Sequence, residues 1–290
     1  MSTTLTILEV VRRTTDFLAQ SGVPNPRLDA EWIMAHSLNV RRMDLYLQFE
    51  RPLNETELAP IRELVRRRGI REPLQHVLGF VDFAGLRIAC DERALIPRPE
   101  TEELIEILKA ALASSPPAYI LDLGTGSGVL ALALAKCFPE ANVLAVDASE
   151  EALDLARENA IVNNLIERVR FRRSNWFADL VESEEDPFDL IVSNPPYLSQ
   201  EEWTCAEPEV REHDPKSALV AKNNGCADLL AILENALGHL CPGGLLAMET
   251  GEAHHDLLAK QATAAGYVDS RGLKDLAKRP RFFLARRTIG

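Results

Sequence analysis

Two kinds of hydrophobic spacing divide the chain. In the first eighty residues, apolar side chains such as Ile7, Val10 and Val11 recur at helical spacing, which is typical of amphipathic helices. From about residue 118, short apolar runs alternate with helical patterns. Such alternation is typical of a mostly parallel sheet with helices on both faces. We therefore predict a small helical domain followed by an α/β domain.

Turn and cap residues give approximate boundaries for these elements. Pro26 opens a second helix, and Asn54 with Glu57 forms the capping-box pattern of another. The stretch 81–88 resembles a small hairpin. We predict a helical bundle over residues 1–80, a hairpin and linker over 81–97, and the α/β domain over 98–290. Its expected strands lie near 119–123, 142–147, 168–173, 188–193 and 244–249, followed by an antiparallel pair near 267–270 and 281–285.

A glycine-rich turn follows the first of these strands. Asp122 precedes the pattern Gly-x-Gly-x-Gly, which ends at Gly128, and a strong helix former follows. Glycines let the backbone approach a ligand closely, and the helix N-terminus favours negative groups. A dinucleotide-binding turn has Gly-x-Gly-x-x-Gly, but Val129 stands at the last of those positions, which argues against NAD or FAD. Asp147 ends the next strand and predicts either a ligand for ribose hydroxyls or a helix N-cap.

The tetrapeptide Asn194-Pro195-Pro196-Tyr197 closes the apolar run 188–193. The prolines lack backbone donors and have a fixed φ, so Asn194 and the neighbouring carbonyls offer acceptors suited to a planar NH2 group. A simple Pro-Pro turn is the alternative. Trp176 follows the third strand, where it either lies against an adenine ring or packs in the core.

Composition narrows the class of protein. Residues 1–97 carry 13 arginines and 13 acids, whereas residues 98–290 carry 19 basic and 31 acidic residues and so the whole net charge of −12. An acidic catalytic half argues against a basic face for long nucleic acid. The five cysteines form no Cys-x-x-Cys pair and the six histidines no metal-binding spacing, so we expect no metal. No signal peptide or membrane-spanning stretch is evident.

The glycine loop, Asp147 and the Asn194–Tyr197 motif together resemble class I S-adenosylmethionine-dependent methyltransferases. More specifically, the chain resembles the PrmC/HemK family of glutamine methyltransferases that modify peptide-chain release factors. The resemblance covers nearly the whole chain. The stretches that carry it beyond the two motifs are 71–76, 78–79, 95–102 and 218–221.

This resemblance implies a Rossmann-like, seven-stranded fold and a cytoplasmic enzyme. Its activity would be transfer of a methyl group from S-adenosylmethionine to the side-chain amide of the glutamine in a Gly-Gly-Gln loop, with the helical domain helping to dock the release factor. The implied cofactor contacts are Asp122, Gly124, Thr125, Gly126, Ser127, Gly128, Asp147, Trp176 and Asn194. The implied substrate contacts are Asn194, Pro195, Pro196 and Tyr197, of which Asn194, Pro195 and Tyr197 would be catalytic. Asn175 departs from the family, which often has Asp there, and this affects the expected cofactor affinity.

Three other functions remain open at this point. A ribosomal-protein glutamine methyltransferase would use the same chemistry, although the stretch 97–101 favours the release-factor enzymes. An N6-adenine methyltransferase would present the same motif to a flipped base, but would need a basic recognition region. A non-catalytic binding module is disfavoured because Asn194 and the glycines are all present.

Overall fold

The computed structural model describes residues 5–180 and 187–289. Its contacts divide the chain into two units. One runs from the N-terminus to Phe80 and includes the separate segment Glu207–His213; the other comprises Val81–Ala206 and the chain from Asp214 onward. The second unit holds the predicted α/β domain.

In the first unit, the described residues up to Phe80 form four α-helices and one 3-10 helix. They are α1 (Ile7–Gln20), α2 (Pro26–Ser37), η1 (Arg42–Leu47), α3 (Glu55–Gly69) and α4 (Leu74–Leu78). Capping boxes begin α1 at Thr6 and α3 at Asn54, the second as the sequence predicts. Ile7, Ile33 and Ile61 are fully or almost fully buried in one apolar core. The first eighty residues thus form the helical bundle that their spacing predicts.

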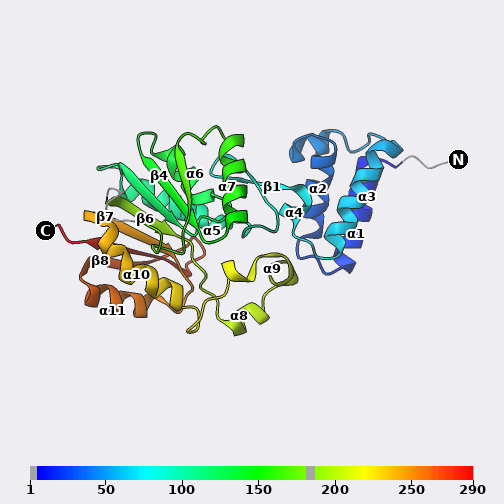
Figure 1. The fold of residues 1–290 in the computed structure, drawn as a ribbon. Helices are drawn as coiled ribbons and strands as arrows, with labels where there is room; N and C mark the ends of the chain where they lie inside the picture. The colour runs from blue at the N-terminus through cyan, green and yellow to red at the C-terminus, as the bar shows by residue number, and fades with distance from the viewer. Residues whose placement is uncertain (1–4, 181–186, 290) are drawn as a thin grey trace. The chain divides into compact units, whose positions relative to one another are not determined.

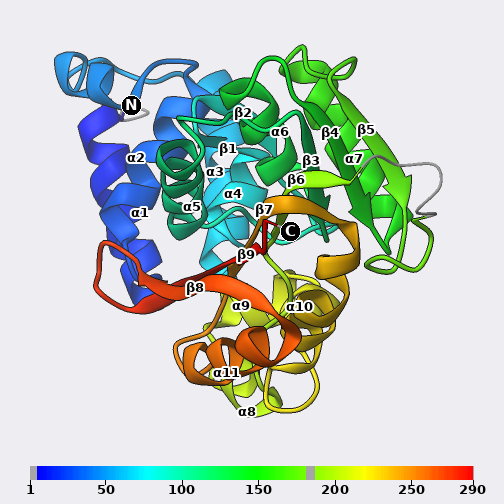
Figure 2. The same cartoon turned by 90° about the vertical axis from the view of Figure 1, so that its left-hand side faces the viewer.

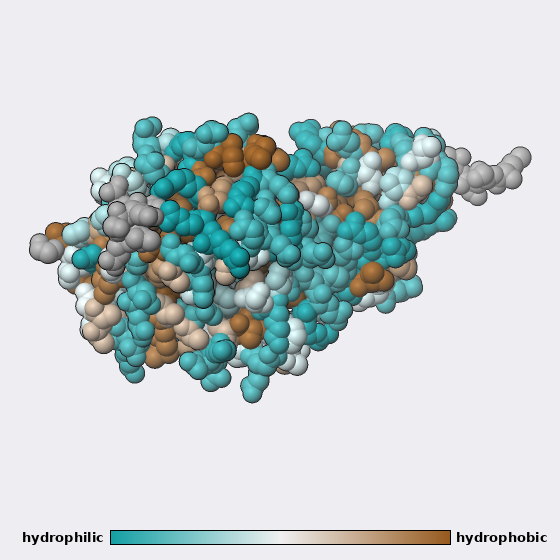
Figure 3. Space-filling model, viewed as in Figure 1, coloured by the Kyte–Doolittle hydropathy of each residue, from teal (hydrophilic) through white to brown (hydrophobic). Residues whose placement is uncertain are grey.

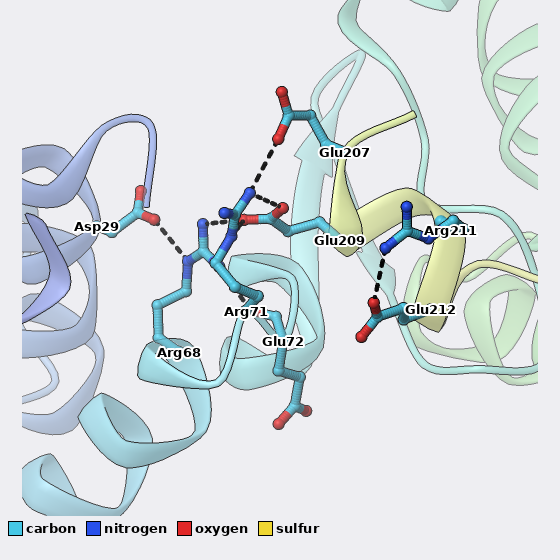
Figure 4. Close-up of polar contacts among 8 residues, drawn as sticks. All are labelled: Asp29, Arg68, Arg71, Glu72, Glu207, Glu209, Arg211 and Glu212. Carbon is cyan, nitrogen blue, oxygen red and sulfur yellow. Dashed lines mark hydrogen bonds and ion pairs between the residues drawn. The ribbon is translucent and has the colours of Figure 1, made fainter. Parts of the chain in front are cut away.

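The segment Glu207–His213, most of which forms the short helix α9 (Pro208–His213), belongs to the helical unit. Arg68 on α3 pairs with Glu209 at 2.8 Å, and Arg71 pairs with both Glu209 and Glu207 (Figure 4). The sequence-based boundary assigned this segment to the α/β domain. Spacing along the chain could not show that carboxylates near residue 208 pair with arginines near residue 70.

The second unit is organised around a seven-stranded sheet with the order β5-β4-β3-β6-β7-β9-β8 (Figure 1). The first five strands in this order are parallel, and β9 and β8 are antiparallel. The bounds are β3 (Tyr119–Leu123), β4 (Asn142–Asp147), β5 (Val169–Arg173), β6 (Phe188–Ser193), β7 (Leu240–Glu249), β8 (Tyr267–Lys274) and β9 (Pro280–Arg287). The predicted fold class is therefore confirmed; β7, β8 and β9 are longer than the sequence predicts.

Helices cover both faces of this sheet. One face packs against α5 (Pro99–Ala111), α6 (Val129–Cys137) and α7 (Glu150–Val162), and the other against α10 (Ala227–His239) and α11 (His255–Ala265). Figures 1 and 2 show α6 and α7 on the opposite side of the sheet from α10 and α11. Strands β1 (Phe80–Phe83) and β2 (Leu86–Ala89) form the predicted hairpin. Three short helices complete the description: α8 (Gln200–Thr204), α9 and η2 (Lys216–Ala218).

The surface is mainly hydrophilic on the face shown in Figure 3, with small hydrophobic patches between hydrophilic residues. Within residues 5–180 and 187–289, none of the helices is both long and apolar enough to cross a membrane.

Candidate active site

The register of the sheet brings the predicted motifs to one edge. On β3, Leu123 is paired with Val146 of β4 and with Ser193 of β6. The next residues on these strands are Gly124, Asp147 and Asn194. Because the carboxyl ends of parallel strands form the binding edge of an open α/β sheet, the three lie together there.

A cavity of about 320 Å³ opens at this edge. Its size is at the lower end of the range for small-molecule sites. The lining includes all of these predicted residues: Gly124, Thr125, Gly126, Ser127, Asp147, Trp176, Asn194 and Pro196. Four other predicted residues, Asp122, Gly128, Pro195 and Tyr197, lie outside the lining.

The glycine loop needs glycine at its first and last positions. Gly124 has φ +68°, and a Cβ there would lie 3.1 Å from the Trp176 ring. Gly128 has φ +83° at the N-cap of α6, and a Cβ there would lie 3.0 Å from Cβ of Ala156. A larger residue would be strained by its φ and would crowd its neighbour. The loop therefore keeps its backbone at the cavity wall.

Asp122 stabilises the glycine loop through hydrogen bonds to its buried carboxyl group. It is 1% exposed, and its Oδ2 accepts hydrogen bonds from Thr125 Oγ1 at 2.7 Å and from the Ala131 amide at 3.1 Å. Burial raises the pKa of this carboxyl to about 7, although both hydrogen bonds oppose that shift. Asp122 thus links the start of the loop to the helix that follows it.

Asp147 connects the loop to the next strand. Its carboxylate accepts from the Gly126 amide and the Ser149 amide, both at 2.9 Å. The N-cap of α7 is Ser149, whose hydroxyl accepts from the Ala152 amide; an N-cap role for Asp147 was therefore a wrong alternative. A carboxylate has about four acceptor positions, so two remain for hydroxyl groups of a ligand in the cavity.

Trp176 both lines the cavity and packs against the core. Its backbone has φ +53°, which is rare for a bulky residue and is often found at functional sites. The indole Nε1 donates to Asp228 at 3.2 Å. Held in this way over Gly124, the ring presents a flat surface to the cavity. The two alternatives for Trp176 are therefore compatible. Asn175 also lines the cavity.

Tyr197 lies behind the cavity wall. Its hydroxyl donates to Glu249 Oε1 at 2.9 Å and accepts from Arg281 Nη1 at 3.0 Å. Burial and the nearby Glu249 carboxylate raise the pKa of the Tyr197 phenol. This tyrosine is therefore a poor general base at neutral pH.

Backbone contacts fix the exit of the Asn194–Tyr197 turn. The Leu198 amide donates to the Leu219 carbonyl at 2.9 Å, and the Ala221 amide donates to the Leu198 carbonyl at 3.0 Å. Gly225, with φ +82°, follows two asparagines that also have positive φ. A Cβ on Gly225 would lie 2.1 Å from the Tyr197 carbonyl oxygen. Gly225 was not predicted from the sequence to be part of the site; its only local signal is the Asn-Asn-Gly turn.

Two further segments line the cavity that sequence chemistry did not assign to it, namely 92–98 and 215–218, the latter without Lys216. Asp214 joins them, because its carboxylate accepts from Arg98 Nη2 at 2.6 Å and from the Ile96 amide at 3.4 Å. Parts of both segments belong to the stretches on which the family resemblance rests. Their place at the cavity gives those stretches a physical role.

Models of known families match both parts of the chain. The PrmC N-terminal domain matches residues 9–79, and a methyltransferase domain matches residues 115–273. A curated release factor glutamine methyltransferase of Rhodopirellula baltica is 38% identical over 279 residues, covering 94% of this chain and 93% of the relative. That of Deinococcus radiodurans is 39% identical, covering 97% and 99%. The chain belongs to the release factor glutamine methyltransferase family.

Solved structures support the family's fold. A methyltransferase from Pyrococcus furiosus has a TM-score of 0.52 at 23% identity, covering 71% of this chain and 90% of its own. The catalytic domain of hMettl16, in complex with a 3'UTR hairpin, has a TM-score of 0.59 at 17% identity, covering 80% and 82%. At these identities the likeness shows the methyltransferase fold alone.

The cavity residues fit the S-adenosylmethionine on which the family's enzymes depend. Asp147 has acceptor capacity for ribose hydroxyls, Trp176 offers a ring surface, and the loop glycines leave room for close backbone approach. In the part of the chain that the structure describes, no group of three or more His, Cys, Asp or Glu side chains could hold a metal ion.

Proposed function

We propose that this chain transfers a methyl group from S-adenosylmethionine to the side-chain amide nitrogen of the glutamine in the Gly-Gly-Gln loop of peptide-chain release factors. The observation that carries the proposal is the place of Asn194. It lines the same cavity as the glycine loop, Asp147 and Trp176. An amide acceptor therefore stands next to the residues suited to the cofactor.

Amide nitrogen is a weak nucleophile because its lone pair is delocalised into the carbonyl. Asn194 Oδ1 and the Pro195 carbonyl would accept its two N–H groups and direct the lone pair toward the methyl carbon. Orientation of reactants lowers a barrier by up to about 7–11 kcal/mol. The bound cofactor supplies an electrophilic methyl group.

The same acceptors would stabilise the positive charge that develops on nitrogen during transfer. The N–CH3 bond would form as the S–CH3 bond breaks and S-adenosylhomocysteine leaves; nitrogen becomes more acidic as it is alkylated, so its proton would pass to water without a strong base. This agrees with the raised pKa of Tyr197, whose hydroxyl is directed to Glu249. In this proposal Tyr197 and Pro196 shape the substrate position, whereas Asn194 and Pro195 hold the amide.

The proposal extends to the partner. The helical unit, which includes Glu207–His213, would help to dock the release factor, and the enzyme would act in the cytoplasm. The acidic balance of residues 98–290 agrees with a protein substrate rather than long nucleic acid.

The test is methylation of an unmodified release factor with methyl-labelled S-adenosylmethionine. A release factor whose Gly-Gly-Gln glutamine is replaced by glutamate is the matched control, because it lacks the acceptor nitrogen. We expect label in the first and none in the second. Total RNA and DNA are incubated in parallel, and label on adenine without label on the release factor would establish the N6-adenine alternative instead.

A further inference from the structure

The buried carboxyl of Glu249 stands at the centre of a hydrogen-bonded network behind the Asn194–Tyr197 motif. Glu249 is the last residue of β7 and is 1% exposed. Its Oε1 accepts from the Tyr197 hydroxyl at 2.9 Å, and its Oε2 accepts from Thr101 Oγ1 at 2.8 Å. One carboxyl group therefore binds two hydroxyls from different elements.

Thr101 continues the network to the cavity. It lies on α5, is 1% exposed, and is in contact with Asn194, whose Nδ2 is 3.5 Å from Thr101 Oγ1. The neighbouring Arg98 begins the same helix as its N-cap. The chain of contacts thus runs from the sheet, through α5, to the side chain proposed to hold the substrate amide.

The donors and acceptors in this network have a fixed direction. A carboxylate only accepts hydrogen bonds, and a hydroxyl has a single proton. Since Thr101 gives its proton to Glu249, its oxygen can only accept from Asn194. Asn194 must therefore turn Nδ2 toward Thr101, which leaves Oδ1 free to face the cavity. Burial in low dielectric strengthens such a network when every member is satisfied.

Arg281 sets the direction of the hydrogen bond between Tyr197 and Glu249. Its Nη1 donates to the Tyr197 hydroxyl at 3.0 Å, so the proton of that hydroxyl is available to Glu249. The charged and titratable groups that influence Glu249 are Arg281, Glu100 and Tyr197. Burial raises the pKa of the Glu249 carboxyl, whereas the hydrogen bonds from Thr101 and Tyr197 and the positive charge of Arg281 oppose that shift and favour the carboxylate.

We propose that Glu249 and Thr101 are positioning residues that orient the Asn194 amide, so that its oxygen and not its nitrogen meets the NH2 group to be methylated. The inference rests on the proposed function for the identity of that NH2 group. Neither residue touches the reacting atoms. If the Asn194 amide were turned the other way, its Nδ2 would face the NH2 group of the substrate. Two hydrogen-bond donors would then oppose each other, and the substrate amide would not bind.

The test compares Thr101→Val, which keeps the shape but removes the hydroxyl, with Thr101→Ser, which keeps the hydroxyl. We expect Thr101→Val to lower kcat for release-factor methylation by about 10- to 100-fold, the effect of a small misorientation. The affinity for S-adenosylhomocysteine should stay near that of the wild type, and the Tm should fall by a few degrees because the buried Glu249 carboxyl loses one hydrogen-bond donor. Thr101→Ser should retain most of the kcat. Equal losses of kcat in Thr101→Val and Thr101→Ser would show that the packing of this side chain matters rather than its hydroxyl group, and would overturn the proposal.

Glu249→Gln provides a second variant of the same shape. A neutral amide offers one acceptor oxygen where the carboxylate offers two, so only one of the two hydroxyls can still donate. We expect a lowered kcat here as well. A wild-type kcat in Glu249→Gln together with rapid hydrogen exchange of the Asn194 NH2 group would contradict the positioning role, even if Thr101→Val fails to fold.

A spectroscopic readout separates this inference from the proposed function. The side-chain NH2 resonances of Asn194, assigned by their loss in Asn194→Ala, should exchange slowly in the wild type and in Thr101→Ser and quickly in Thr101→Val. This measurement needs no substrate. Unchanged exchange in Thr101→Val would overturn the orienting network whatever the substrate is. A wild-type enzyme that leaves the release factor unmethylated would contradict the proposed function alone.

Discussion

Single residues at the cavity edge divide into those that would bind cofactor and those that would hold the acceptor. Asp147 stands at the end of β4 and accepts from the Gly126 and Ser149 amides. Asn194 directly follows β6, which lies on the other side of β3 from β4. Because the two residues lie on different strands, their substitutions should separate binding from turnover.

Asp147→Ala should weaken S-adenosylmethionine binding while leaving kcat at saturating cofactor close to that of the wild type. The loss of charge-assisted hydrogen bonds, worth about 1.5–3 kcal/mol, corresponds to roughly a 10- to 100-fold rise in Kd. Isothermal titration calorimetry measures this. Asp154→Ala is the control, since Asp154 lies on the exposed face of α7 and pairs only with the partly exposed Arg157 among the contacts described. A normal Kd in Asp147→Ala would contradict the assigned role.

The close contact between Gly225 and the Tyr197 backbone predicts that a side chain at position 225 disturbs the Asn194–Tyr197 turn. Gly225→Ala should lower the Tm and reduce kcat by about 10- to 100-fold, because its Cβ would lie 2.1 Å from the Tyr197 carbonyl oxygen. Gly266→Ala is the matched control: φ there is +97°, but no atom lies within 4 Å of the added Cβ. It should lower stability by about 1–2 kcal/mol, the cost of the left-handed conformation, with kcat unchanged. Equal kcat values in the two variants would argue against the contact.

At the level of elements, the arginine-rich end of α3 is a structural feature. Arg66 pairs with Glu63, Arg67 with Glu72, and Arg68 with Asp29 and Glu209. Burial would raise the pKa of Glu209, but hydrogen bonds from Arg71 and Arg68 lower it to about 2. Arg68 and Arg71 hold α9 to the helical unit through Glu209 (Figure 4).

Arg68→Ala should destabilise the helical unit by about 3–5 kcal/mol, because it leaves Asp29 as an unpaired buried acid. Arg66→Ala on the same helix should cost less than about 1 kcal/mol, since the side chains of Arg66 and Glu63 are more than half exposed. Urea denaturation followed by circular dichroism compares the two. Similar midpoints would contradict the structural role of the Arg68 network.

The sequence predicted those elements whose signals are local. Alternating apolar runs identified the seven strands, and the cap residues identified the helix starts at Pro26 and Asn54. The Asn194–Tyr197 turn and the glycine loop could be assigned to one edge because parallel strands share their carboxyl ends. Periodicity carries no information about contacts between residues far apart in the chain. Three features depend on such contacts: the packing of α9 in the helical unit, the role of Asp214, and the contact of Gly225 with Tyr197.

The whole molecule combines a catalytic unit with a helical unit that carries exposed apolar side chains. Among the latter are Met43, 64% exposed, and Leu47, 86% exposed. Single exposed apolar residues are common on protein surfaces. Two in one short helix, in the unit proposed to dock the release factor, are a specific candidate contact.

Leu47→Glu should therefore raise KM for the full-length release factor by about tenfold, the effect of losing roughly 1.4 kcal/mol of apolar contact. KM for a short Gly-Gly-Gln peptide should not change, because the peptide lacks the docking surface. Leu276→Glu, which alters an equally exposed leucine of the catalytic unit, is the control. If Leu47→Glu left both KM values unchanged, docking would have to use another surface.

The central claim is that Asn194 holds a release-factor glutamine for methylation. It is tested most directly by the mass of the Gly-Gly-Gln peptide from release factors isolated from cells that lack this chain and are supplied with either the wild type or Asn194→Ala. Circular dichroism establishes that the variant is folded. We predict one methyl group on the glutamine with the wild type and none with Asn194→Ala. Full methylation of that glutamine by Asn194→Ala would contradict the account.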